Sequence, residues 1–185
     1  ICVRLVGSEM CIRDSRGAIS HQDDRGNKGR TPAGSIQVMS AGTGIFHSEY
    51  NLEDEETSLY QIWIKPARNG VTPRWETAEL PKTPVLNKLQ LLVSGDGTAP
   101  LQMQQNARIF VGHLNKDTKI EQPIQGKAYL LISEGDVIVK DLLVHKGDGV
   151  AISDEVSVNI TAMSDAEVLV IEVPGLQLSL IHISE

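Results

Sequence analysis

The chain has 185 residues, 41% hydrophobic and 22% charged, and its 24 acidic side chains outnumber 17 basic ones to give a net charge of −7. This composition is typical of a globular protein, and the acidic balance argues against nucleic-acid binding through phosphate contacts. No apolar run in the sequence approaches the roughly 20 residues that a membrane-spanning helix needs, so no membrane association is expected.

The two ends of the chain share an unusual coding relationship. Residues 8–15 (SEMCIRDS) can be translated from the DNA string TCG GAG ATG TGT ATA AGA GAC AG, and its reverse complement encodes residues 178–185 (LSLIHISE). An inverted repeat of this kind is typical of a sequencing adapter, so residues 1–15 and 178–185 are expected to be adapter-derived and not native. Both cysteines, Cys2 and Cys11, lie in this leader. The remaining segment therefore offers no disulfide framework, cysteine–zinc site or thiol nucleophile.

Short runs of β-branched and aliphatic residues alternate with turn-forming clusters along the rest of the chain. These runs predict strands at residues 35–40, 58–65, 88–93, 108–112, 128–132, 136–139, 156–160 and 167–173. Similar glycine turns lead into the strand at Ser35 and into a strand after Lys146. Close, regular strand spacing predicts an all-β barrel or sandwich, and the repeated turn predicts two related lobes at residues 16–85 and 86–177.

The densest candidate site lies between Gly34 and Asn51. A turn at residues 42–44 precedes a strand in which His47 and Glu49 face one side while Ser48 and Tyr50 face the other. An imidazole and a carboxylate on one face offer two ligands to a divalent transition metal. On spacing alone, the alternative of a hydrogen-bonded or solvated strand pair stays open.

This stretch resembles the second conserved motif of cupins, Gly-(X)5-Pro-X-Gly-(X)2-His-(X)3-Asn. The residues in register are Gly34, Gly42, His47 and Asn51, with Ser40 in the proline position and two extra residues before the histidine. Residues 39–49 resemble the pirin family more specifically, as do residues 21–23, 60–64 and 148–152. The likeness is closest to bacterial pirin-like quercetin dioxygenases and covers essentially all of residues 17–174.

The resemblance implies an all-β bicupin, with the metal in a truncated N-terminal lobe and a degenerate C-terminal lobe. In that family the ligands are a His-X-His pair together with the residues matching His47 and Glu49. The His-X-His pair would fall near Val3 and Leu5, inside the leader, so the chain as given is expected to bind metal poorly or not at all. The expected metal is Fe(II), with Mn, Ni, Cu or Zn as alternatives.

The resemblance also implies an activity for the intact parent: a cytoplasmic, metal-dependent dioxygenase that opens the heterocyclic ring of flavonols and releases carbon monoxide. The substrate is then a flavonol-like small molecule, His47 serves as a ligand, and Glu49 is both a ligand and the general base. The alternative is a metal-binding regulatory or protein-interaction module without turnover, whose protein partner the sequence does not identify.

Other polar and aromatic residues receive structural interpretations. His21 is expected to hydrogen-bond to Asp23 or to a backbone group, whereas His113 and His145 are expected to be structural or exposed. The acidic run at residues 53–56 is interpreted as a solvated loop. Phe46 and Met39 are assigned to core packing, with the lining of an apolar pocket beside the metal as the alternative. Trp63 and Trp75 are assigned to the core or to a lobe interface.

Overall fold

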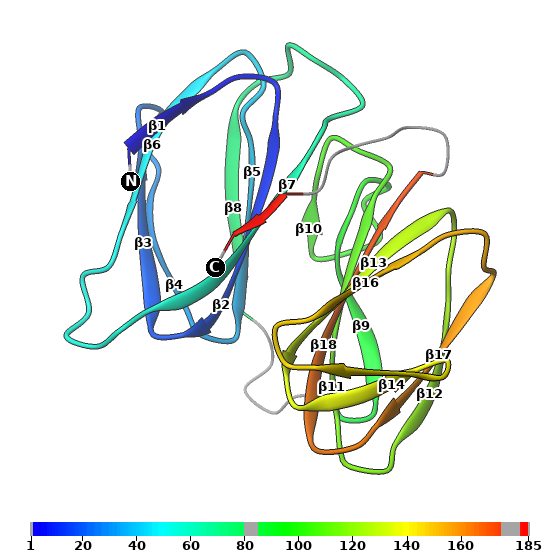
Figure 1. Cartoon of the computed structure of the whole chain (residues 1–185). Coiled ribbons are helices and arrows are strands. Elements are labelled where there is room, and N and C mark those ends of the chain that lie inside the picture. Colours follow the sequence, from blue (N-terminus) through cyan, green and yellow to red (C-terminus); the bar gives the residue numbers. More distant parts are fainter. Residues whose placement is uncertain (1, 80–84, 175–181, 185) are drawn as a thin grey trace. The chain divides into compact units, whose positions relative to one another are not determined.

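The computed structural model describes residues 2–79, 85–174 and 182–184 (Figure 1). Strands and turns make up these ranges, as the all-β prediction requires, and no described residue is helical. The chain divides into two compact units: unit 1 combines residues 1–80, 95–105 and 179–185, and unit 2 combines residues 81–94 and 106–178. Residues 95–105 thus accompany the first unit, although they follow part of the second in sequence.

Unit 1 consists of two antiparallel sheets that face each other (Figure 1). The first sheet has the order β1 (Cys2–Leu5), β6 (Ile45–Tyr50), β3 (Ala18–Asp23) and β4 (Lys28–Pro32). The second has the order β19 (His182–Ser184), β7 (Ser58–Ile64), β2 (Glu9–Arg16), β5 (Ser35–Ser40) and β8 (Arg74–Glu79). Leu5, Met10, Met39 and Ile45 from both sheets share one buried apolar cluster, so the space between the sheets is a packed core.

The segment predicted to be adapter-derived occupies two strand positions in unit 1. β1 pairs with β6 so that position 3 lies opposite His47 and Leu5 lies opposite Ile45, and β2 lies between β5 and β7. Backbone ladders can be formed by any residue that carries an N–H group, so this pairing is independent of the origin of the segment. The assignment to an adapter stays a prediction.

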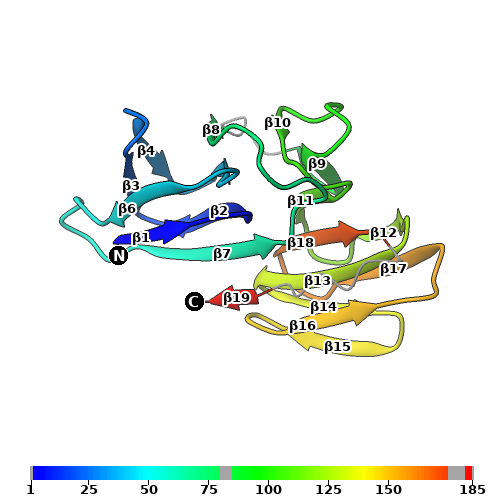
Figure 2. The ribbon, with the colours of Figure 1, turned by 90° about the horizontal axis from the view of Figure 1, so that it is seen from above.

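Unit 2 repeats the two-sheet arrangement. One sheet has the order β11 (Arg108–Leu114), β18 (Ala166–Val173), β13 (Lys127–Glu134) and β16 (Gly149–Ile152). The other has the order β12 (Lys119–Pro123), β17 (Ser157–Ala162), β14 (Asp136–Val139) and β15 (Leu142–His145). β9 (Lys88–Ser94) also belongs to unit 2, whereas β10 (Leu101–Gln102) belongs to unit 1. Figure 2 shows β13 beside β18, with which it pairs from Lys127 to Glu134.

The interior of unit 2 is apolar. Leu130, Ile132, Val168 and Val170 from the first sheet pack with Ile160 and its neighbours from the second, and all five side chains are fully buried. The two glycine turns that suggested an internal repeat also share a backbone conformation, since Gly34 and Gly147 both have a φ of 86°. A left-handed φ of this size is accessible to glycine without strain, which explains the residue choice at both turns.

No helix in the described part of the chain is long and apolar enough to cross a membrane.

A buried ion pair in unit 2 makes stability depend on pH. Arg108 and Glu172 are direct cross-strand partners, and Arg108 Nε donates to Glu172 Oε2 at 2.7 Å. Burial raises the pKa of Glu172 above 4.5 despite these hydrogen bonds. A raised folded-state pKa means that the folded chain binds the Glu172 proton more tightly than the unfolded chain. The stabilisation that comes from binding this proton is therefore lost as the pH rises from about 4.5 through the folded pKa.

We therefore expect the Glu172→Gln variant to gain free energy of unfolding relative to the parent chain as the pH rises from 4.5 to 7. The gain should be about 1.4 kcal/mol for each unit by which the folded pKa is raised. Urea unfolding of both proteins at several pH values measures it. A difference that stays constant with pH would contradict the raised pKa.

Candidate functional site

The candidate site is built on the pairing of β3 with β6. In this register His21 lies opposite Glu49, and Asp23 lies opposite His47. Directly opposed residues of an antiparallel pair project to the same face. All four side chains are buried, with 9% or less of each residue exposed. Two imidazoles and two carboxylates therefore meet inside unit 1.

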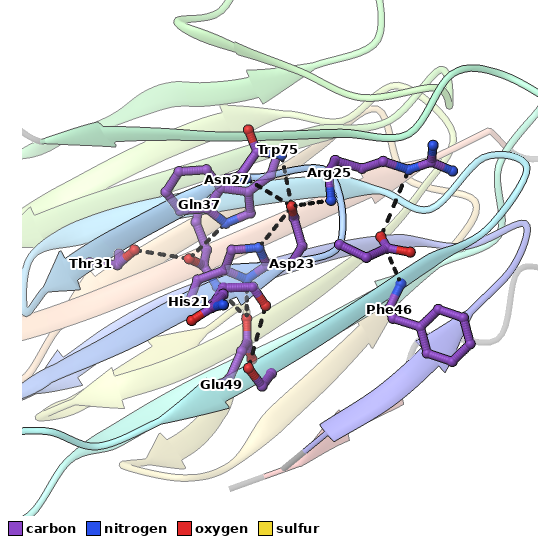
Figure 3. Close-up of polar contacts among 12 residues, drawn as sticks. His21, Asp23, Arg25, Asn27, Thr31, Gln37, Phe46, Glu49 and Trp75 are labelled. Atoms are coloured by element: carbon purple, nitrogen blue, oxygen red, sulfur yellow. Dashed lines mark hydrogen bonds and ion pairs between the residues drawn. The ribbon is translucent and has the colours of Figure 1, made fainter.

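The predicted alternation along β6 is confirmed. Ile45, His47 and Glu49 are buried, whereas the residues between them are half-buried or exposed. The expectation for Phe46 is wrong: its side chain is 52% exposed and lies away from the cluster (Figure 3). Strand alternation is the reason, because Phe46 lies on the outer face, where the Arg4 guanidinium sits 5.4 Å from the ring centroid. Met39 is fully buried and packs in the core.

The predicted hydrogen bond of His21 is also confirmed. Its Nε2 lies 3.2 Å from Asp23 Oδ2. The other Asp23 oxygen, Oδ1, accepts from the backbone N–H groups of Arg25 and Asn27 at 2.9 Å, and Asn27 Nδ2 donates to Oδ2 at 2.8 Å. Burial pushes the pKa of Asp23 upward, but the hydrogen bonds from Asn27, His21 and Arg25 outweigh it and hold the pKa below its usual value. Asp23 is thus an ionised acceptor for His21.

Glu49 receives hydrogen bonds that the sequence did not reveal. Gln37, on β5 of the facing sheet, donates from Nε2 to Glu49 Oε1 at 2.6 Å. The same oxygen lies 3.6 Å from His21 Nδ1. Gln37 Oε1 in turn accepts from Thr31 Oγ1 at 2.9 Å and from Trp75 Nε1 at 3.2 Å (Figure 3). The one signal in the sequence was a glutamine between Ile36 and Val38 in a predicted strand; the structure shows it fully buried, and a buried amide needs hydrogen-bond partners.

Trp75 connects the two sheets of the site. Its indole stacks on the His21 ring with the centroids 4.8 Å apart and the planes 8° from parallel. Gly29 on β4, directly opposite His21, makes room for this ring, because a Cβ at position 29 would lie 2.2 Å from Trp75 Cη2. The absence of a side chain at Gly29 is therefore a packing requirement.

His47 is the residue best suited to bind a metal. Burial lowers the pKa of His47 below the usual value. The neighbouring His21, whose ring centroid is 5.8 Å away, also lowers it, whereas the carboxyl groups of Glu49 and Asp23 raise it and are outweighed. The ring is consequently neutral at neutral pH, which is the form that coordinates metals. Its Nδ1, like that of His21, is buried without a hydrogen-bond partner among the described residues. Such an orphaned atom fits a ligand role.

The full ligand set expected for a metal site is incomplete. His47 and Glu49 supply two donors, but the positions expected for the other two hold Val3 and Leu5, which have no donor atoms. No three His, Cys, Asp or Glu side chains in the described ranges are arranged to hold a metal ion. The residues of this chain thus fit half of the expected metal site and not the other half.

The remaining polar candidates lie outside the site. His113 and His145 are partly exposed, and each has an acidic neighbour that sequence spacing did not show: Glu167 at 3.2 Å and Asp136 at 2.8 Å. These partners come from neighbouring strands, so only pairing reveals them. The run at residues 53–56 is mostly exposed, and Glu53 pairs with Arg30 at 2.8 Å.

Comparisons with known proteins agree with this architecture. A family model described as Pirin matches residues 14–64, and one described as Quercetinase C-terminal cupin domain matches residues 91–173. A pirin-like protein of Caulobacter vibrioides is 42% identical over 165 residues, which cover 87% of this chain and 70% of that protein. Quercetin 2,3-dioxygenase of Escherichia coli is 39% identical over 162 residues, covering 85% of this chain and 69% of that protein. The crystal structure of the bacterial pirin YhhW of Escherichia coli in complex with nickel(II) matches with a TM-score of 0.87 and 36% identity, over 95% of this chain and 76% of that one.

The stacking of Trp75 on His21 can be tested at Gly29. We expect Gly29→Ala to displace the indole, to move Trp75 emission to longer wavelength and to cost roughly 1–3 kcal/mol of stability through overpacking. Fluorescence in a Trp63→Phe background isolates Trp75, and Lys28→Ala on the same strand is the matched control. Unchanged emission in Gly29→Ala would show that the ring does not depend on this glycine.

Proposed function

The chain belongs to the pirin family, and from this premise we propose that the intact protein is a metal-dependent dioxygenase that opens quercetin-type flavonols. The observation that carries the proposal is the buried His47–Glu49 pair on the inner face of β6. The name of the Escherichia coli relative supports the flavonol substrate, and the nickel complex of YhhW supports the metal.

Each site residue has a defined role in this proposal. His47 and Glu49 would hold the metal together with two histidines that we expect at the positions of Val3 and Leu5 in the intact protein. Fe(II) is the expected ion, with Mn, Ni, Cu and Zn as alternatives. When bound, the metal supplies Lewis-acid chemistry at the flavonol oxygens. Glu49 accepts the proton of the flavonol hydroxyl, and its burial keeps bulk water from competing for that proton.

A second candidate function has its own support. The chain carries no ligand donor at positions 3 and 5, and a site with two donors binds a metal weakly. This observation favours a binding or regulatory module without turnover for the chain as it stands. Cytoplasmic localisation stays a prediction for either function.

The incomplete ligand set can be repaired in this chain. Position 3 lies opposite His47, and Leu5 is buried in the same core as Ile45, so imidazoles introduced at both positions would lie on the face of His47. We expect Val3→His/Leu5→His to bind one nickel(II) per chain after dialysis, and the unmodified chain to retain substantially less. Arg4→His/Val6→His, two exposed positions of the same segment, is the matched control. Equal nickel retention by the two double variants would contradict this site.

The activity is tested on the intact protein, whose coding sequence is obtained from the native DNA upstream of the Gly17 codon. We expect the metal-loaded protein to consume quercetin and release carbon monoxide, and Glu49→Ala to reduce turnover to background. Ser48→Ala, on the outer face of the same strand, should leave turnover unchanged. A metal-loaded intact protein that consumes no flavonol would refute the dioxygenase and favour the binding module.

A further inference from the structure

A continuous hydrogen-bond chain links Trp75 to Glu49 through one glutamine. The indole N–H of Trp75 reaches Gln37 Oε1 at 3.2 Å, and Gln37 Nε2 reaches Glu49 Oε1 at 2.6 Å. The three residues come from β8, β5 and β6, so the chain crosses from one sheet of unit 1 to the other (Figure 3).

The chemistry of the donors fixes the direction of this chain. An indole nitrogen carries a hydrogen and cannot accept, so the Gln37 atom that faces Trp75 must be the amide oxygen. The amide nitrogen of Gln37 then necessarily faces Glu49. Because that nitrogen only donates, Glu49 Oε1 must act as an acceptor. Thr31 Oγ1 donates to the same amide oxygen at 2.9 Å. Because a hydroxyl can donate or accept, the indole alone fixes the orientation of the amide.

Trp75 is itself held in place at one face and at one edge of its ring. One face stacks on His21, and the ring edge occupies the space that Gly29 leaves. An indole anchored in this way cannot turn its N–H away from Gln37 without clashing or losing the stack. The fixed indole therefore fixes the orientation of the Gln37 amide, and the amide in turn fixes the position of the Glu49 carboxyl group.

We propose that Gln37 is a positioning residue for Glu49, and that Trp75 sets the polarity of the Gln37 amide. Gln37 holds Glu49 Oε1 as a hydrogen-bond acceptor and thereby fixes the plane of the carboxylate inside the barrel. A fixed carboxylate pays less to reach its productive geometry than one that can rotate. The proposal rests on the assigned role of Glu49 as ligand and base.

The hydrogen bond itself is tested in this chain by nuclear magnetic resonance of ¹⁵N-labelled side-chain amides. We expect one Gln37 Nε2 proton to be shifted downfield and slow to exchange, and to lose both properties in Glu49→Ala but not in Ser48→Ala. Trp75→Phe keeps an aromatic ring on His21 but removes the N–H, so it should broaden or shift the Gln37 signal. Gln37 protons that match those of the exposed Gln22 would overturn the proposal.

The functional consequence is tested in the metal-loaded intact protein. We expect Gln37→Leu to lower kcat for quercetin roughly 10- to 100-fold, with KM changed by less than about threefold and the pH profile displaced. Gln61→Leu is the matched control, because the Gln61 amide contacts Met10 Sδ and not the site. Trp75→Phe should also lower kcat, by a smaller factor. This variant tests the positioning role if Gln37→Leu does not fold.

The outcomes separate this proposal from the proposed function. Wild-type turnover that is lost in Glu49→Ala but retained in both Gln37→Leu and Trp75→Phe would overturn the positioning role and leave the dioxygenase intact. Absence of turnover in the wild-type protein would refute the dioxygenase, and the amide spectrum would then decide the Gln37–Glu49 interaction by itself.

Discussion

The carboxylate of Glu49 is enclosed in a protein interior, and the rest of the site depends on supplying it with donors. A carboxyl group removed from water is costly to bury unless hydrogen bonds replace its hydration. Gln37 provides that replacement from the opposite sheet, and its amide oxygen accepts from Thr31 and Trp75. Trp75 in turn requires a glycine at the edge of its ring. The hydrogen bonding of one buried carboxyl group thus depends on residues of β4, β5 and β8.

The two imidazoles beside this carboxylate are held differently. His21 is tied to Asp23, whose pKa is kept low by several hydrogen bonds, and it is covered by the indole. Both rings have a buried Nδ1 without a hydrogen-bond partner among the described residues, and burial lowers the pKa of His47. His21 is additionally fixed through Nε2, which lies 3.2 Å from Asp23 Oδ2. The proposed ligand role of His47 therefore rests on its place in the family motif beside Glu49.

The two units have the same sheet arrangement but bury different kinds of side chains. Unit 1 places polar and ionisable side chains between its sheets, whereas the buried cluster of unit 2 is aliphatic apart from one aromatic ring. Unit 2 also buries two acids, and each has a partner: Glu172 accepts from the cross-strand Arg108, and Glu167 lies beside His113 and Ser133. The buried cluster of two imidazoles and two carboxylates thus lies in unit 1, whereas the interior of unit 2 is mainly aliphatic.

The sequence by itself determined the all-β class, the family, most strand positions and the shared face of His47 and Glu49, because these depend on local periodicity and on one contiguous motif. It did not reveal β3, β4, β8, β12 or β15. β4, β8 and β12 contain few apolar residues and lie largely half-buried or exposed, so they lack the apolar pattern by which strands are predicted. Only the tertiary structure brought Gln37, Thr31 and Trp75 to Glu49 and gave His113 and His145 their acidic neighbours. Strand order and sheet packing join residues far apart in sequence, and no local pattern encodes which of them will meet.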